Sequence, residues 1–146
     1  MKITSSAFQE GGTIPEKFSK NGQNVSPELR IEGAPADAKS LAVIIDDPDA
    51  PVGLFMHWLL WNIDPKTTEI PEGSTPSGAV QGKNDFGETG YGGPQPPSGT
   101  HRYYFKVFAL DRPLDLKPAA KRRDVDTAMK GHVIAQGQLM GRYSKK

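Results

Sequence analysis

Four stretches of the chain have the hydrophobic patterns typical of β-strands: residues 41–47, 54–63, 101–110 and 135–143. In the first, apolar positions recur with period two, so Val43, Ile45 and the polar Asp47 are expected on one face. The second is apolar on both faces, which favours an inner position in a sheet. In the third, His101 and Tyr103 share one face and Arg102 lies on the other. The fourth stretch is the weakest.

The remaining sequence predicts shorter elements. The first third offers two or three short strands around Ile3, Phe8 and residues 29–31, and residues 119–131 are the one candidate helix, with Gly131 as its stop. Residues 64–99 are dominated by turn chemistry, and a loop of that length is usually functional. We therefore expect one all-β domain over residues 1–146, a two-sheet antiparallel β-sandwich with one or two short helices.

Composition narrows the function classes. The 18 basic and 17 acidic residues give a net charge of +1, which argues against a nucleic-acid-binding protein. The chain has no cysteine, which excludes disulfides, thiolate zinc sites and cysteine nucleophiles. No stretch resembles a membrane span or the core of a signal peptide, so we expect a cytoplasmic protein. Residues 117–146 carry eight basic and two acidic side chains. They form either a solvated surface or a weak basic patch that contacts an acidic partner or, peripherally, an anionic lipid surface.

Polar side chains near strand ends suggest a ligand pocket. His57 lies inside an apolar strand, His101 opens another after a glycine- and proline-rich loop, and Asp47 closes a third on its apolar face. Polar groups that converge within an apolar wall are typical of a small-molecule site. Two imidazoles would favour an anion such as phosphate, with Asp47 or Asp49 orienting one ring.

Two further expectations concern the wall of this pocket. We expect backbone N–H groups of the glycine-rich loop to supplement the imidazoles, and these are the amides of Gly92, Gly93, Gly99 and Thr100. The Tyr103 hydroxyl either reaches the pocket or is satisfied in the core. The other aromatic residues of the strands are expected to pack the core: Phe55, Trp58, Trp61, Tyr104, Phe105 and Phe108.

Two catalytic alternatives stay open on the residues alone. His57, His101 and Asp47 have the ligand types of a two-histidine, one-carboxylate metal site, although no local spacing demands it. Ser98 lies close to His101 in sequence and is the one placed candidate for a serine hydrolase, but the chain has no Gly-x-Ser-x-Gly motif. A protein without catalytic activity, metal or cofactor is the leading interpretation.

Two longer motifs resemble a known family. The first is Asp-Pro-Asp-Ala-Pro at residues 47–51, followed by Met-His-Trp at 56–58 and Asn-Ile at 62–63. The second is Gly-Tyr-Gly-Gly-Pro-Gln-Pro-Pro-Ser-Gly-Thr-His-Arg-Tyr at residues 90–103. Together with weaker similarity elsewhere, they make the chain similar to the phosphatidylethanolamine-binding proteins, also called Raf kinase inhibitor-like proteins, and above all to short bacterial and archaeal members.

The resemblance implies a β-sandwich with a small anion pocket at one end. Asp47, His57, His101 and Tyr103 would line it, and Gly93 with Pro94 would form its rim. The residues expected to give structural support are the second aspartate of the first motif, Asp49, and the arginine of the second, Arg102. Because alternation places Arg102 outside the pocket, we expect the two to pair and to hold the motifs together.

The function implied by the resemblance is binding of a phosphate-like group, including a phosphoethanolamine head group. The partners we expect are a small phosphorylated or carboxylated ligand and a protein such as a kinase or protease. A surface-acting inhibitor of such an enzyme is the alternative, and a metal-dependent or serine hydrolase is the third. Short prokaryotic members also suggest a homodimer.

Overall fold

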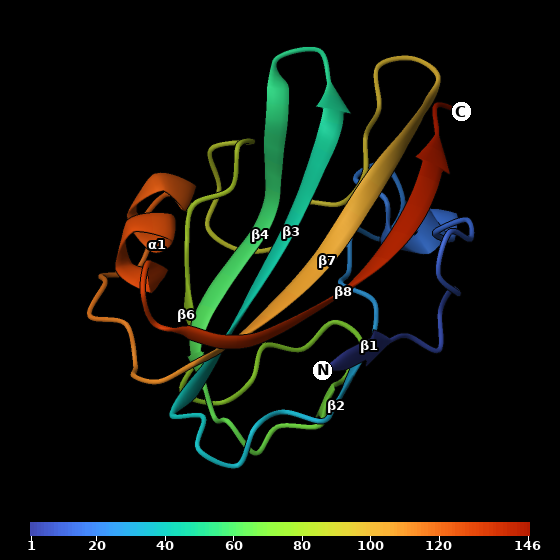
Figure 1. Cartoon of the computed structure of the whole chain (residues 1–146). Coiled ribbons are helices and arrows are strands. Elements are labelled where there is room, and N and C mark those ends of the chain that lie inside the picture. The colour runs from blue at the N-terminus through green and yellow to red at the C-terminus, as the bar shows by residue number, and fades with distance from the viewer.

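Ten secondary-structure elements make up the computed structural model, which describes residues 1–146 (Figure 1). They are β1 (Lys2–Thr4), the 3-10 turn η1 (Glu16–Phe18), β2 (Leu29–Glu32), β3 (Ser40–Ala50), β4 (Gly53–Ile63), β5 (Glu69–Ile70), β6 (Val80–Gln81), β7 (Thr100–Leu110), α1 (Arg122–Met129) and β8 (Val133–Ser144). The strands form two antiparallel sheets, one in the order β1-β2-β5 and one in the order β6-β4-β3-β7-β8. The all-β, two-sheet prediction is confirmed, with one short helix.

The core lies on both faces of the large sheet. On one face, Val43 and Ile45 of β3 pack with Ile31 of the small sheet in a cluster of 20 buried residues. On the other, Ile44 packs with Val125 of α1 in a cluster of nine. Strand β3 can be apolar on both faces because each face is covered, which removes water from its β-branched side chains.

The predicted strands are confirmed in the long elements and, around Ile3 and residues 29–31, in β1 and β2. Phe8 is the exception. Phe8 lies in no strand; it is buried between the sheets, 5.3 Å from the ring of Phe105. The long segment 64–99 contains two strands of two residues each. The helix is shorter than predicted at both ends, and no helix is long and apolar enough to cross a membrane.

Candidate functional site

A cavity of about 330 Å³ opens at one end of the sandwich, between the β3–β4 hairpin and the loop that leads into β7. This hairpin and this loop stand at the top of Figure 1. It is lined by Asp47, Ala50, Pro51, Val52, Phe55, His57, Asp85, Phe86, Gln95, Pro97, His101 and Tyr103. Four of the predicted ligand-binding residues are therefore neighbours here although they come from three strands. These four are Asp47, His57, His101 and Tyr103.

Asp47 and His101 form a buried hydrogen-bonded pair at the floor of this cavity. The Nδ1 atom of His101 lies 2.6 Å from Oδ2 of Asp47, and both side chains are less than a tenth exposed. The other carboxylate oxygen of Asp47 accepts the backbone N–H of Asp49 at 2.7 Å. Both oxygens of Asp47 are thus occupied, and its ionised form holds a proton on Nδ1 of His101.

A β-bulge directs His57 into the same cavity. Ile45 of β3 faces Trp58 of β4, while the next residue of β3 faces Met56, so His57 is an extra residue in β4. Trp58 belongs to the core between the sheets and Met56 to the core beneath α1. Bulges re-aim side chains in this way. The bulge is what allows Trp58 to fill the core while the neighbouring His57 lines the pocket.

The His57 ring is held by one strong hydrogen bond and by aromatic contacts. Its Nδ1 atom lies 2.6 Å from the carbonyl oxygen of Gly92. The rings of Phe55, Phe86 and Tyr103 lie 5.0, 5.5 and 5.2 Å from it, centroid to centroid. Burial lowers the pKa of His57 below its usual 6.5, although the Gly92 carbonyl and the Asp47 carboxylate oppose this.

Tyr103 belongs both to the core and to the pocket. Its side chain is 1% exposed and packs with the residues between the sheets, while its face lines the cavity. Its hydroxyl is one of three buried polar side-chain atoms in the protein without a hydrogen-bond partner. Burial and the negative charge of Asp47 raise the pKa of this phenol, so the hydroxyl stays protonated and able to donate.

The expected pairing of Asp49 with Arg102 is confirmed. The Asp49 carboxylate accepts Nε, Nη2 and the backbone N–H of Arg102, at 2.8–2.9 Å. The bidentate guanidinium is the largest cause that lowers the pKa of Asp49 from 3.8 to about 2. This pair ties the hairpin to the start of β7 outside the cavity, which fixes the distance between Asp47 and His101.

Gly93 and Pro94 do not line the cavity. Both are buried; the Gly93 N–H donates to Asn24, and the Pro94 carbonyl accepts the backbone N–H of Lys20. A Cβ at Gly93 would lie 2.1 Å from the carbonyl oxygen of Phe18, so only glycine allows this close approach of two chain segments. These two residues support the wall from behind.

The N–H groups of Gly92 and Gly93 were expected to face an anion, but both are hydrogen-bonded within the protein. The Gly92 N–H donates to the carbonyl of His57, and the Gly93 N–H is used as described above. Gly99 and Thr100 lie outside the lining of the cavity. The polar groups of this pocket are therefore side chains and not backbone amides of the loop.

Sequence reasoning missed several lining residues. Phe55 was expected in the core, but its ring forms a wall of the cavity beside Phe86. Lys20 lies 4.4 Å from the Phe86 ring centroid and pairs with Glu88, which holds this wall in place. Phe55 could have been found by period-two counting, since it faces Asp47 across the hairpin.

Asp85 is a second missed residue. One of its carboxylate oxygens accepts the backbone N–H of Met56 at 2.8 Å, and its side chain lines the cavity. Nothing in the local sequence Asn-Asp-Phe signals this, because the contact joins positions 29 residues apart. The pocket thus contains two carboxylates, one of which is fully hydrogen-bonded.

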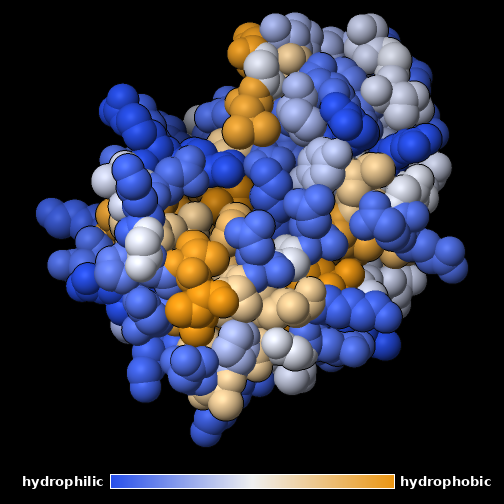
Figure 2. All heavy atoms as spheres, in the orientation of Figure 1, coloured by the Kyte–Doolittle hydropathy of each residue, from blue (hydrophilic) through white to orange (hydrophobic).

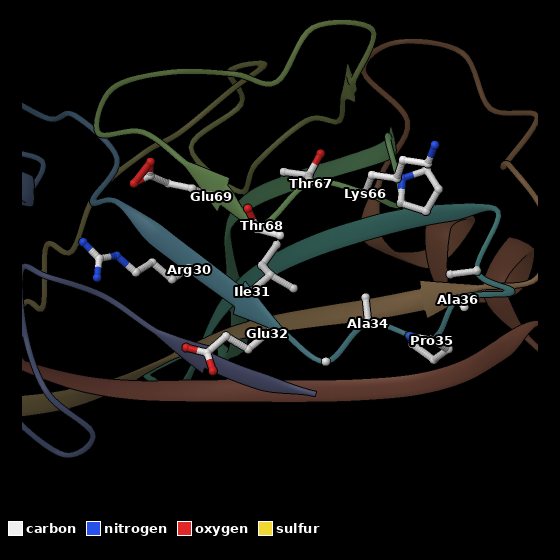
Figure 3. A pocket seen from close by; sticks show the side chains of 13 residues that line it. Arg30, Ile31, Glu32, Ala34, Pro35, Ala36, Lys66, Thr67, Thr68 and Glu69 are labelled. Atoms are coloured by element: carbon white, nitrogen blue, oxygen red, sulfur yellow. The ribbon is translucent and has the colours of Figure 1, made fainter.

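A larger hollow lies elsewhere in the molecule. It measures about 840 Å³ and is formed by β2, the turn after it and the loop before β5 (Figure 3). Its buried residues, Ile31 and Ala38, are apolar, and its charged side chains are exposed at the rim. It offers no buried polar group to orient a ligand, so the smaller cavity is the better candidate.

The metal-site and serine-hydrolase alternatives concern His57, His101, Asp47 and Ser98. No group of three or more His, Cys, Asp and Glu side chains is arranged to hold a metal ion. Ser98 is exposed, and it is Asp47 rather than a serine that hydrogen-bonds the His101 ring.

Comparison with protein families decides the lineage. The family model described as phosphatidylethanolamine-binding protein matches residues 4–144. The chain belongs to the phosphatidylethanolamine-binding protein family. The resemblance based on the two motifs is confirmed.

Relatives of this family member are similar over nearly the whole of this chain. The UPF0098 protein of Methanothermobacter thermautotrophicus is 47% identical and covered over 99% of both chains; that of Pyrococcus horikoshii is 50% identical over 97% of this chain and 76% of its own. A solved structure of a putative phosphatidylethanolamine-binding protein homolog from Chlamydia trachomatis has a TM-score of 0.94 at 42% identity, covering 99% of this chain and 97% of that one. The structure of YbcL from E. coli has a TM-score of 0.93 at 33% identity, covering 99% and 98%.

Proposed function

We propose that this member of the family binds a small oxyanion, a phosphate monoester or a carboxylate, in the cavity between the β3–β4 hairpin and β7, without catalysing a reaction. One observation carries the proposal. Two imidazole rings and a tyrosine ring line a single cavity: His57, His101 and Tyr103. Each ring uses Nδ1 for a protein acceptor, which leaves both Nε2 atoms for a ligand.

The Asp47–His101 pair orients one ring for an anion. The Asp47 carboxylate lies 2.6 Å from Nδ1 of His101 and holds this ring in place, which leaves its Nε2 atom for the ligand. The apolar rings around these groups strengthen the attraction because they exclude water.

Calorimetric titration of phosphoethanolamine tests this proposal. Wild-type protein should bind it with saturation, and the double variant His57→Ala/His101→Ala should not. The matched control is His132→Ala, because this third histidine pairs with the exposed Asp111 and lies outside the cavity lining. The proposal is refuted if the double variant still binds phosphoethanolamine. It is also refuted if the wild-type protein binds none of phosphate, phosphoethanolamine and acetate at millimolar concentration.

A protein partner is the second candidate. Val52 and Leu54, at the tip of the β3–β4 hairpin, are 83% and 50% exposed, and Figure 2 shows an apolar patch at the top of the molecule, where this hairpin ends. Exposed apolar side chains beside a pocket are typical of contact surfaces. If the protein inhibits a kinase or protease through this surface, Val52→Ser/Leu54→Ser should abolish inhibition while His101→Ala leaves it intact. The opposite pattern would exclude the surface-acting alternative.

A further inference from the structure

The cavity between the β3–β4 hairpin and β7 has a polar floor and an apolar mouth. The floor is buried, with each side chain less than a tenth exposed, and consists of Asp47, His57, His101 and the Tyr103 ring. The mouth is the half-buried or exposed part of the lining toward solvent, and its apolar residues are Ala50, Pro51, Val52, Phe55, Phe86 and Pro97. An oxyanion on the floor and the group attached to it therefore meet different surroundings.

Two polar side chains also line the outer part of the cavity. The side-chain amide of Gln95 is engaged outside it, where Nε2 donates to Oδ1 of Asn21 at 3.1 Å. Asp85 is exposed, and one of its carboxylate oxygens accepts the backbone N–H of Met56 at 2.8 Å. The negative charge of Asp85 disfavours a second acidic group on the ligand. The mouth thus offers a ligand mainly hydrocarbon surface.

The two phenylalanine rings of the mouth are held in place next to the floor. Phe55 and Phe86 pack edge to face, with centroids 4.8 Å apart, and the Lys20 ammonium lies 4.4 Å from the Phe86 centroid. The His57 ring of the floor lies 5.0 Å from Phe55 and 5.5 Å from Phe86. An oxyanion at His57 therefore places its substituent beside both rings, and packing on fixed rings costs little conformational entropy.

The size of the cavity leaves room for such a substituent. A water molecule takes about 30 Å³ in the liquid, so the cavity of about 330 Å³ has room for about eleven waters, far more than a phosphate group displaces. Ligand pockets of this size usually bury most of the surface of the molecule they hold. The remaining volume is bordered by the mouth, because the polar side chains are gathered at the floor.

Resting on the proposed function, we propose that the pocket selects phosphate monoesters with a compact hydrocarbon substituent, cycloalkyl or aryl, over monoesters of polyhydroxylated, sugar-like alcohols. Each CH₂ group that leaves water against the rings strengthens binding about fourfold. A hydroxyl in the same place loses its water and finds no partner on the rings, which weakens binding. The ligand is bound unchanged, and no bond is made or broken.

The test compares three esters with the same phosphate group: methyl phosphate, cyclohexyl phosphate and myo-inositol 1-phosphate. Cyclohexyl and inositol phosphate share a six-membered carbon ring and differ in its hydroxyls. Calorimetric titration at about pH 8 keeps all three in one charge state, since their second pKa is about 6. Cyclohexyl phosphate should bind at least about tenfold more tightly than either of the others, because several CH₂ groups are buried and one unpaired hydroxyl alone costs about tenfold.

Substitutions in the mouth locate the selectivity. Phe55→Ser and Phe86→Ser each remove a ring and keep the floor, so the advantage of cyclohexyl over methyl phosphate should fall at least about threefold. The affinity for methyl phosphate should stay within about twofold of wild type. Phe108→Ser is the matched control, since this half-buried ring packs beneath α1 outside the cavity lining and should leave the advantage unchanged. Thermal melting checks that the variants are folded.

The outcomes separate this inference from the proposed function. Equal wild-type affinity for methyl and cyclohexyl phosphate overturns the inference and leaves anion binding standing. Inositol phosphate that binds as tightly as cyclohexyl phosphate, or an advantage that persists in folded Phe55→Ser and Phe86→Ser, also overturns it. If phosphoethanolamine binds and cyclohexyl phosphate does not, the inference alone fails. If no phosphate ester binds, the proposed function fails with it.

Discussion

Replacing Asp47 by asparagine should weaken anion binding through the neighbouring ring. The carboxylate of Asp47 accepts two N–H groups, from the backbone of Asp49 at 2.7 Å and from Nδ1 of His101 at 2.6 Å. Asparagine offers only one acceptor oxygen. If this oxygen keeps the backbone bond, the amide NH₂ faces Nδ1, and His101 must move its proton to Nε2 and remain neutral.

The magnitude follows from the loss of charge at a buried site. Asp47 and His101 are 3% and 6% exposed, so water does not compensate the change. A hydrogen bond to a charged group contributes about 1.5–3 kcal/mol, against about 1 kcal/mol for a neutral one. Because each 1.4 kcal/mol is about tenfold in affinity, the Kd for phosphoethanolamine should rise roughly two- to thirtyfold for a net loss of about 0.5–2 kcal/mol.

Calorimetry measures the Kd, and ¹⁵N NMR of the ring nitrogens identifies the tautomer. The variant should carry its proton on Nε2 of His101, whereas the wild type carries one on Nδ1. Asp111→Asn is the matched control, since it removes an exposed carboxylate that pairs with His132 and lies outside the cavity lining. An Asp47→Asn protein with wild-type Kd and a protonated Nδ1 would refute this account of how Asp47 orients the ring.

Three further substitutions test the support around the pocket. Arg102 holds the pKa of Asp49 at about 2, below 3.8, so this contribution to stability is present above pH 4 and is lost as pH falls toward 2. Urea unfolding of Asp49→Asn should show less change in stability between pH 4 and pH 2 than wild type; an unchanged profile would contradict the pairing. Arg122→Met removes one of the two cations that pair with the buried Asp46. The free energy of unfolding should fall by about 2 kcal/mol, less than the roughly 3–5 kcal/mol expected when a buried pair is fully broken. A fall of under about 0.5 kcal/mol in urea unfolding would contradict this prediction. Gly93→Ala forces a Cβ against a backbone carbonyl and should lower the free energy of unfolding by more than about 2 kcal/mol. A melting temperature equal to that of the wild type would contradict this prediction and show that the loop can move to make room.

Much of the site could be read from local patterns. Period-two alternation placed Asp47 on the face of Val43 and Ile45, and it placed Arg102 opposite His101; the structure has both. These predictions succeed because side-chain direction along a regular strand depends only on position. The two motifs also identified the family, which comparison confirmed.

The direction of His57, the use of the loop amides and the walls of the pocket were decided by tertiary structure. The bulge at His57 exists only in the pairing of β4 with β3, and strict counting from Trp58 would turn this ring to the opposite face. The N–H groups of Gly92 and Gly93 found acceptors on distant parts of the chain. Asp85 reaches the cavity through a bond to Met56 that no local spacing reveals. The sequence by itself determined the strands and the residue types of the site, because both follow from neighbours along the chain; which atoms remain free for a ligand depends on contacts between segments, and only folding settles those.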